Sequence, residues 1–205
     1  MRNIVNDPRY IREREEMMEY VQDQYHKPEE TEKVLSTSGK FNLEVHHYHH
    51  EEGIRRYSYS KGVVRSHLNE IIDVVYRNYP AFLFSWTVSG SNEYLLCGLD
   101  YQGYSIIDLS NHKTVHYVPE SAYEGQGFCW GEVFCFPEKD LVVVDGCYWA
   151  CPYELVFLDF TNPMVLPYKE LFRVEIDQIV NWDSWKSTGT VRYIDENGSE
   201  REYAF

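Results

Sequence analysis

The pattern that best predicts the fold runs from Phe128-Cys129-Trp130 through the turn residues Pro137-Glu138-Lys139-Asp140 into Leu141-Val142-Val143-Val144-Asp145-Gly146. The same order of aromatic run, polar turn and strand-like run recurs at 84–98 and at 180–193. The apolar run 141–144 is continuous, which is typical of a β-strand that is buried on both faces. We therefore interpret these segments as copies of one β-sheet unit.

The tryptophans of the three copies give the period of the repeat. Trp86, Trp130 and Trp182 are separated by 44 and 52 residues, and a further copy at 35–45 lacks the tryptophan. The units continue with a second pair of strand-like runs joined by a polar turn, as at 106–117. A period of about 40 to 50 residues is typical of supersecondary units that stack on one another. The sequence thus predicts a mainly β fold of three to four β-meander repeats, with an N-terminal helix.

The order of turn, strand, hairpin, strand, Asp and turn resembles the blades of WD-type β-propellers. The resemblance covers about residues 35–205, although the Gly-His and Trp-Asp signatures of those blades are missing. Segments 127–130 and 145–154 are also similar to an uncharacterised family of bacterial proteins. These resemblances imply a partial or small propeller-like domain and no particular activity.

The N-terminal segment has a different pattern. Asp7 and Pro8 form a helix start, since Asp accepts from the first free N–H groups and Pro lacks the N–H that would be unpaired there. The helix is expected to end at Pro28, and 29–33 reads as a solvated linker. We predict a helix and linker at 1–34 and a β-repeat domain at 35–205. The helix is expected to cover a sheet edge or face, or else to bind a partner.

The charge balance limits the possible partners. The chain has 33 acidic and 19 basic residues, a net charge of −14, which is unfavourable for binding to nucleic acid or to an anionic membrane. It favours a protein partner with a basic surface, and it leaves the oligomeric state open. The chain contains no apolar run of about 20 residues and its start does not resemble a secretion signal. Together with an odd number of cysteines, five, this predicts a cytoplasmic protein.

The candidate binding residues lie in two equivalent hairpins. One hairpin follows the strand at 93–98 and the other follows the strand at 141–146, so both are expected at the same end of the sheets. Tyrosine and tryptophan in such loops favour binding, although these rings could also pack between the blades. The predicted site contains Asp100, Tyr101, Tyr104, Asp145, Tyr148, Trp149, Tyr153 and Glu154.

Other functions have weaker support in the sequence. No phosphate-binding loop, nucleophile elbow or zinc-protease motif is present, so an enzyme is less favoured than a binding module. The carboxylates and aromatic rings of the hairpins would also suit a hydrolase or a carbohydrate-binding protein. The run 46–50 has histidines on both faces of a strand, and Cys147 and Cys151 are four apart, but a zinc site needs two such pairs. We predict a non-catalytic protein-binding module without a cofactor or metal.

Overall fold

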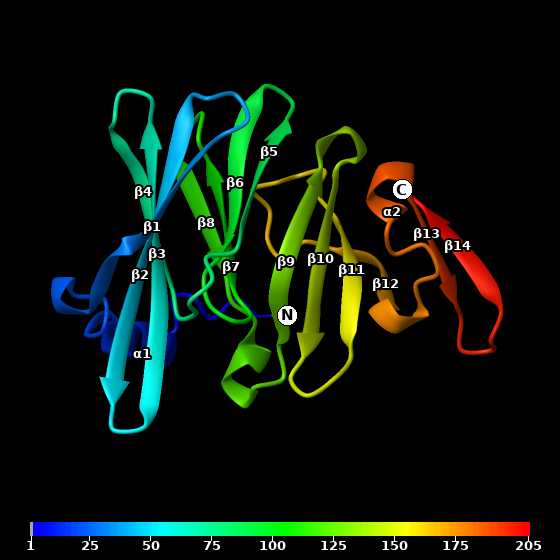
Figure 1. Cartoon of the computed structure of the whole chain (residues 1–205). Helices are drawn as coiled ribbons and strands as arrows, with labels where there is room; N and C mark the ends of the chain where they lie inside the picture. Colours follow the sequence, from blue (N-terminus) through cyan, green and yellow to red (C-terminus); the bar gives the residue numbers. More distant parts are fainter. Residues whose placement is uncertain (1) are drawn as a thin grey trace.

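The computed structural model describes residues 2–205, and most of them lie in antiparallel β-sheets (Figure 1). The first sheet contains β1 (His26–Leu35), β2 (Phe41–Glu52), β3 (Arg55–Ser66) and β4 (Ile71–Arg77). The second contains β5 (Phe84–Ser89), β6 (Asn92–Gly98), β7 (Tyr104–Asp108) and β8 (Lys113–Tyr117). The third contains β9 (Phe128–Phe136), β10 (Leu141–Tyr148), β11 (Tyr153–Asp159) and β12 (Glu170–Glu175). A hairpin of β13 (Thr190–Ile194) and β14 (Glu200–Ala204) follows.

The helices are short and few in the described chain. They are α1 (Pro8–Met18) and α2 (Trp185–Thr188), with 3-10 turns η1 (Asp23–Tyr25), η2 (Glu120–Glu124), η3 (Pro137–Lys139) and η4 (Ile176–Gln178). Over residues 2–205, no helix is long and apolar enough to cross a membrane.

The sheets stand side by side in chain order, from the first sheet on the left of Figure 1 to the C-terminal hairpin on the right. Each strand pairs with its neighbour in sequence, which makes every four-stranded sheet a meander. The predicted small, propeller-like arrangement of β-meanders with an N-terminal helix is confirmed.

Three hydrophobic cores join the sheets. Leu43, Leu95 and Ile107 are fully buried in the core shared by the first two sheets and the N-terminal segment. A second core, rich in tyrosine, joins the second and third sheets. In the third core, Val143 packs with Trp185 and the C-terminal hairpin. Leu95 and Val143 both lie on the second strand of their sheets, as the repeat predicts. Their side chains face opposite directions, because Leu95 packs toward the first sheet and Val143 packs toward the C-terminal hairpin.

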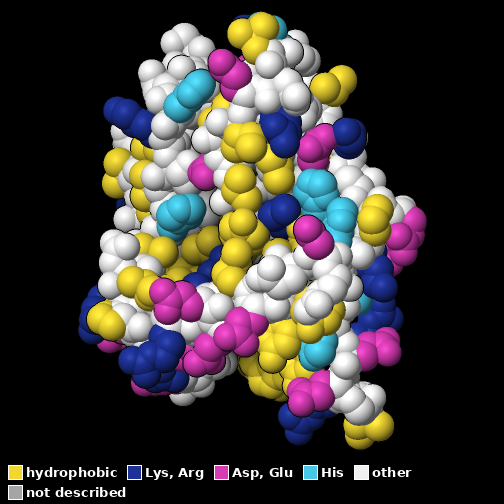
Figure 2. Space-filling view, turned by 90° about the vertical axis from the view of Figure 1, so that its left-hand side faces the viewer, with side chains coloured by type: hydrophobic (Ala, Val, Ile, Leu, Met, Phe, Trp, Pro, Cys, Tyr) yellow, Lys and Arg dark blue, Asp and Glu magenta, His cyan; other side chains and the backbone are white. Residues whose placement is uncertain are grey.

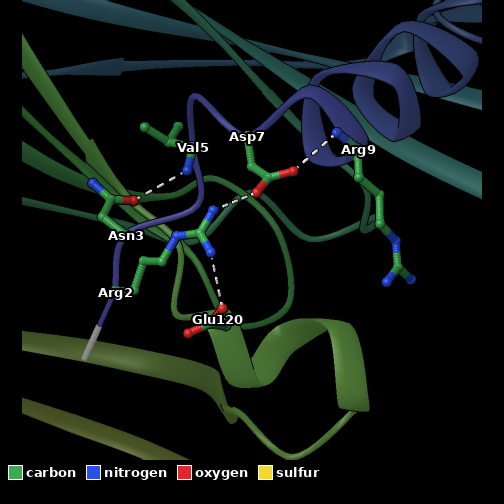
Figure 3. A network of polar contacts seen from close by, with 6 residues as sticks. All are labelled: Arg2, Asn3, Val5, Asp7, Arg9 and Glu120. Atoms are coloured by element: carbon green, nitrogen blue, oxygen red, sulfur yellow. Dashed lines mark hydrogen bonds and ion pairs between the residues drawn. The ribbon is translucent and has the colours of Figure 1, made fainter.

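The N-terminal segment is fixed against the second sheet by polar contacts (Figure 3). Arg2 pairs with Asp7 at 2.7 Å and with Glu120 at 3.2 Å. Asp7 caps α1 by accepting from the backbone N–H of Arg9, and Pro8 occupies the first helical position, as predicted. Further along α1, Arg14 donates to the carbonyl oxygens of Tyr76 and Leu99, so the helix contacts both the first and the second sheet where β4 and β6 end.

The predicted end of the helix and the predicted linker are wrong. α1 ends at Met18, and segment 29–33 lies within β1. Pro28 is accommodated because the register of β1 on β2 shifts between Lys27 and Glu32, and an irregular edge strand is where a missing N–H is tolerated. β1 therefore runs through the expected boundary at residue 34, and the division into two domains stays a prediction.

The third tryptophan does not start a strand as the first two do. Trp182 lies in a turn before α2, and Gly189 ends that helix with a φ of 65°. Asn181 holds the turn by donating to the carbonyl oxygen of Thr190 at 2.7 Å and accepting from the N–H of Arg192 at 2.8 Å. The repeat is therefore complete in three sheets, and the C-terminal hairpin is a partial unit.

The side formed by β1–β4 carries an apolar stripe. Figure 2 shows hydrophobic side chains running along this side of the molecule, with histidines on both sides of the stripe. This apolar stripe is an alternative binding surface to the cavity described below.

Candidate functional site

A cavity of about 630 Å³ lies where segments of all three sheets meet. Its walls come from the β4–β5 connection, the β6–β7 loop, β9 and the β10–β11 hairpin. We call it the aromatic cavity. Its lining consists of Arg77, Tyr79, Ala81, Phe82, Leu83, Phe84, Tyr101, Cys129, Trp130, Gly131, Glu132, Val133, Phe134, Cys147, Trp149 and Tyr153.

Four aromatic side chains at this cavity are exposed. The exposed fraction is 76% for Trp149, 56% for Tyr153, 43% for Tyr101 and 38% for Tyr79. Tyr79 and Tyr101 contact each other edge to face, with ring centroids 5.0 Å apart. Three of the four, from two hairpins, were predicted from the sequence, and the structure brings them to one cavity.

The β10–β11 hairpin holds its aromatic residues outward. Cys147 pairs with Tyr153 across the two strands, and the N–H of Cys151 donates to the carbonyl oxygen of Tyr148 at 2.9 Å to close the turn. Ala150 has a φ of 61°, a left-handed conformation that is unfavourable for a residue with a Cβ. The tight turn leaves Trp149 without a packing partner on the outer side.

The β6–β7 loop keeps its acidic residue inside. Asp100 is buried and accepts hydrogen bonds from the hydroxyl of Tyr10, at 2.7 Å, and from the backbone N–H groups of Gln102 and Gly103. Asp100, which the sequence suggested as a binding residue, is therefore inside the protein, because α1 places Tyr10 over it.

The remaining predicted residues lie outside the aromatic cavity. Tyr104 is buried, stacks on Trp130 with centroids 4.3 Å apart, and faces a second cavity of about 490 Å³ together with Tyr148. Glu154 pairs with Arg173 at 2.6 Å beside that second cavity. Of the predicted set, three residues thus line the aromatic cavity and two line the second cavity, and Trp130 forms part of the wall of both.

Asp145 lies next to the aromatic cavity but outside its lining. It pairs in register with Glu132 on β9, and its Oδ1 is buried without a hydrogen-bond partner in the described chain. Burial, and then the charge of Glu132, raises the pKa of Asp145 to about 6, while Lys186 acts in the opposite direction. Two neighbouring carboxylates make this edge of the cavity electronegative.

Arg77 is the functional candidate that the sequence did not indicate. It is 2% exposed, and its guanidinium donates to the carbonyl oxygens of Ala81, at 3.0 Å, and Trp130, at 3.2 Å. A Cβ on Gly98 would lie 2.9 Å from its Cζ, so glycine is needed for this close approach. A charged residue at the end of a strand is usually exposed to solvent, so the sequence pattern does not indicate a functional role for Arg77.

The cysteines of the cavity are poor nucleophiles. Burial raises the pKa of Cys129 and of Cys147, so both thiols stay protonated at neutral pH. Across residues 2–205, all five cysteines are free.

The histidine run at 46–50 is held in protein contacts. His47 contacts the carbonyl oxygen of Pro80 at 3.0 Å, and His49 contacts Glu30 at 2.9 Å. His46 lies 3.2 Å from His26, ring nitrogen to ring nitrogen. In the part of the chain that the structure describes, no three His, Cys, Asp or Glu side chains are grouped to hold a metal ion.

Comparison with known proteins gives one informative relative. The chain is 32% identical over 130 residues to the uncharacterized protein R762 of Acanthamoeba polyphaga mimivirus. The match covers 63% of this chain and about half the length of the relative. No protein family model matches the chain. The resemblance to a bacterial family with WD-type repeats is therefore wrong, since the relative found is viral and no family model supports such repeats.

Proposed function

We propose that this chain is a non-catalytic protein-binding module that takes a peptide segment of its partner into the aromatic cavity. The observation that carries the proposal is the convergence of four exposed aromatic rings, from three separate segments, on one cavity. Tyrosine and tryptophan are the residues most often found at the energetic centres of interfaces. They bury a large area while losing little side-chain entropy.

The arrangement of the cavity supports the same proposal. Its lining also contains Phe82, which is buried, and Phe84 and Phe134, which are half-buried, and these rings offer apolar contact. Tyr153 is the first residue of β11, and the other three rim residues lie in short connections between strands. A preformed site of this kind binds without a large ordering cost.

The charge of the chain favours a partner with a basic surface. The net charge is −14, and Glu132 and Asp145 lie side by side at the edge of the cavity. Such a field increases the association rate of a basic partner.

The hydrolase alternative has less support. A glycoside hydrolase needs two carboxylates facing the substrate, and Glu132 is the one carboxylate in the described lining of the aromatic cavity. The protonated thiols of Cys129 and Cys147 also argue against a cysteine nucleophile.

A display selection tests the proposal. Random peptides are selected on the wild-type chain, and their affinities are measured on Trp149→Ala and on Trp182→Ala. Trp182, 41% exposed, lies before α2 and outside the cavity lining, so it is the matched control. We expect W149A to weaken binding about fivefold or more, the loss of about 1 kcal/mol at an interface centre, and W182A to leave it unchanged. Equal effects of both variants, or no selected peptides at all, would contradict the proposal.

A further inference from the structure

Arg77 connects the three sheets and lacks an acidic partner. It is the last residue of β4 in the first sheet, its guanidinium lies over Gly98 of the second, and it donates to Trp130 of the third. None of the carboxylates in residues 2–205 forms an ion pair with it. The ring of Tyr79 lies 5.4 Å from its Cζ and provides a cation–π contact.

The hydrogen-bonding capacity of Arg77 is only partly used. A guanidinium has five N–H donors. Two are used, on the carbonyl oxygens of Ala81 and Trp130, so three remain without a protein acceptor in the described chain, and one of these three is the buried Nε–H. Burial lowers the pKa of Arg77 and the nearby charge of Asp100 acts in the opposite direction, so this buried cation is only partly compensated by the protein. Arg77 is one of the residues that line the aromatic cavity, with 2% of its surface exposed.

We propose that Arg77 binds a carboxylate of the partner segment at the base of the aromatic cavity, while the exposed rings hold the residues around it. This inference rests on the proposed function and names the group that the cavity recognises. The source that suits the site best is the C-terminal carboxylate of a basic peptide. Such a chain end carries a single anionic group to Arg77, and its basic side chains then face Glu132 and Asp145.

The surroundings favour a carboxylate over a phosphate. The planar guanidinium matches a carboxylate with two parallel hydrogen bonds. Glu132 is in the same wall and most of the lining is apolar, so a dianion would be repelled and poorly solvated there. The ligand that fits these contacts therefore has a single negative charge and an otherwise apolar surface.

Three capped compounds test the inference on the full chain. They are N-acetyl-phenylalanine, its neutral amide, and N-acetyl-aspartyl-phenylalanine amide, titrated by calorimetry. The first presents a terminal carboxylate, the third a side-chain carboxylate, and the second neither. We expect N-acetyl-phenylalanine to bind about tenfold more tightly than the amide, as a charge-assisted bond to a buried group provides. The third compound then shows whether a side-chain carboxylate is accepted as well.

Variants of Arg77 and a labelling measurement complete the test. Arg77→Met is expected to reduce the affinity of the acid to that of the amide, and Arg77→Lys to retain part of the difference. If R77M fails to fold, the acid is still expected to slow alkylation of Cys129 and Cys147, in the cavity wall, and not of exposed Cys151.

Several results would overturn the carboxylate inference. They are equal binding of acid and amide, no binding of either acid, unchanged acid binding in R77M, and displacement of the acid by inorganic phosphate at equal concentration. If selected peptides still depend on Trp149 in such a case, the proposed function stands and only this inference fails. If the selection yields no peptide, the proposed function itself fails.

Discussion

The β6–β7 loop at 99–103 and the β10–β11 loop at 149–152 occupy the same place in successive sheets, but the second loop is much more exposed than the first. In the first loop Asp100 is buried and bound by Tyr10 of α1. In the second, Trp149 is 76% exposed and no helix covers it. The difference shows that equivalent hairpins of a repeat acquire different roles through what the rest of the chain places over them. The first loop is held in the fold through Asp100 and presents Tyr101 at the cavity, whereas the second loop is exposed along its whole length.

The largest expected effect is at Tyr104, which the pattern of the sequence placed with the binding residues. Its ring stacks on Trp130 and its hydroxyl accepts from the N–H of Tyr168 at 3.1 Å. Tyr104→Ala is expected to lower the free energy of unfolding by about 4 kcal/mol, because a buried aromatic ring is removed. Tyr104→Phe, which loses only the hydrogen bond, is expected to lose about 1 kcal/mol. Urea unfolding followed by circular dichroism measures both, and a mild effect of Y104A would place this residue in the binding group.

Asp100 has the next largest expected effect. Asp100→Ala removes an acceptor for three groups and leaves the hydroxyl of Tyr10 unpaired, so a loss of about 3 kcal/mol in unfolding free energy is expected. Tyr10→Phe removes one of these hydrogen bonds and is expected to lose about 1 kcal/mol. The same unfolding measurement compares the two. Equal losses would mean that the β6–β7 loop is not held by its Asp100 contacts.

The pH dependence of stability tests the environment of Asp145, which lies on β10, the strand that leads into the β10–β11 loop. Its pKa is raised to about 6, so the folded chain binds more protons than the unfolded chain between pH 6 and the ordinary Asp value of 3.8. Ionised Asp145 therefore lowers stability above pH 6, and this penalty disappears as pH falls toward 4. Asp145→Asn is expected to raise the unfolding free energy at pH 7.5 by about 1 kcal/mol, since the half-exposed group is screened by solvent.

The pH profile is the control for this prediction. The difference between D145N and the wild type is expected to shrink at pH 4.5, because protonation removes the same charge. Thermal unfolding at the two pH values measures it. A difference that is independent of pH would show that the substitution acts through packing.

The smallest effect on stability is expected at the open loop. Trp149→Ala is expected to change the unfolding free energy by less than about 0.5 kcal/mol, the usual range for an exposed side chain without special contacts. The melting temperature of the variant measures it directly. A loss of several kcal/mol would mean that the ring packs against the chain, and the contrast between the loops would disappear.

The strands could be predicted from the sequence because their signals are local. The apolar run of β10 and the Asn197-Gly198 turn of the C-terminal hairpin lie within a few residues of the elements that they specify. β1 was missed because Pro28 and the charges of 29–33 are typical of a linker, whereas pairing with β2 overrides that preference.

The site could be predicted only in part, for a related reason. Tyr101, Trp149 and Tyr153 could be found because loop position and residue type together indicate exposure. The burial of Asp100 depends on Tyr10, 90 residues away, and the role of Arg77 depends on Trp130, 53 residues away. No local pattern records contacts at such separations.

Amide hydrogen exchange with a selected peptide tests the central claim most directly, namely that the aromatic cavity is the binding site. The account predicts slower exchange at 99–103 and 147–153 when the peptide is bound, with little change in β2 and β3. Protection confined to the apolar stripe on the side of β1–β4 (Figure 2), with both loops unchanged, would contradict it.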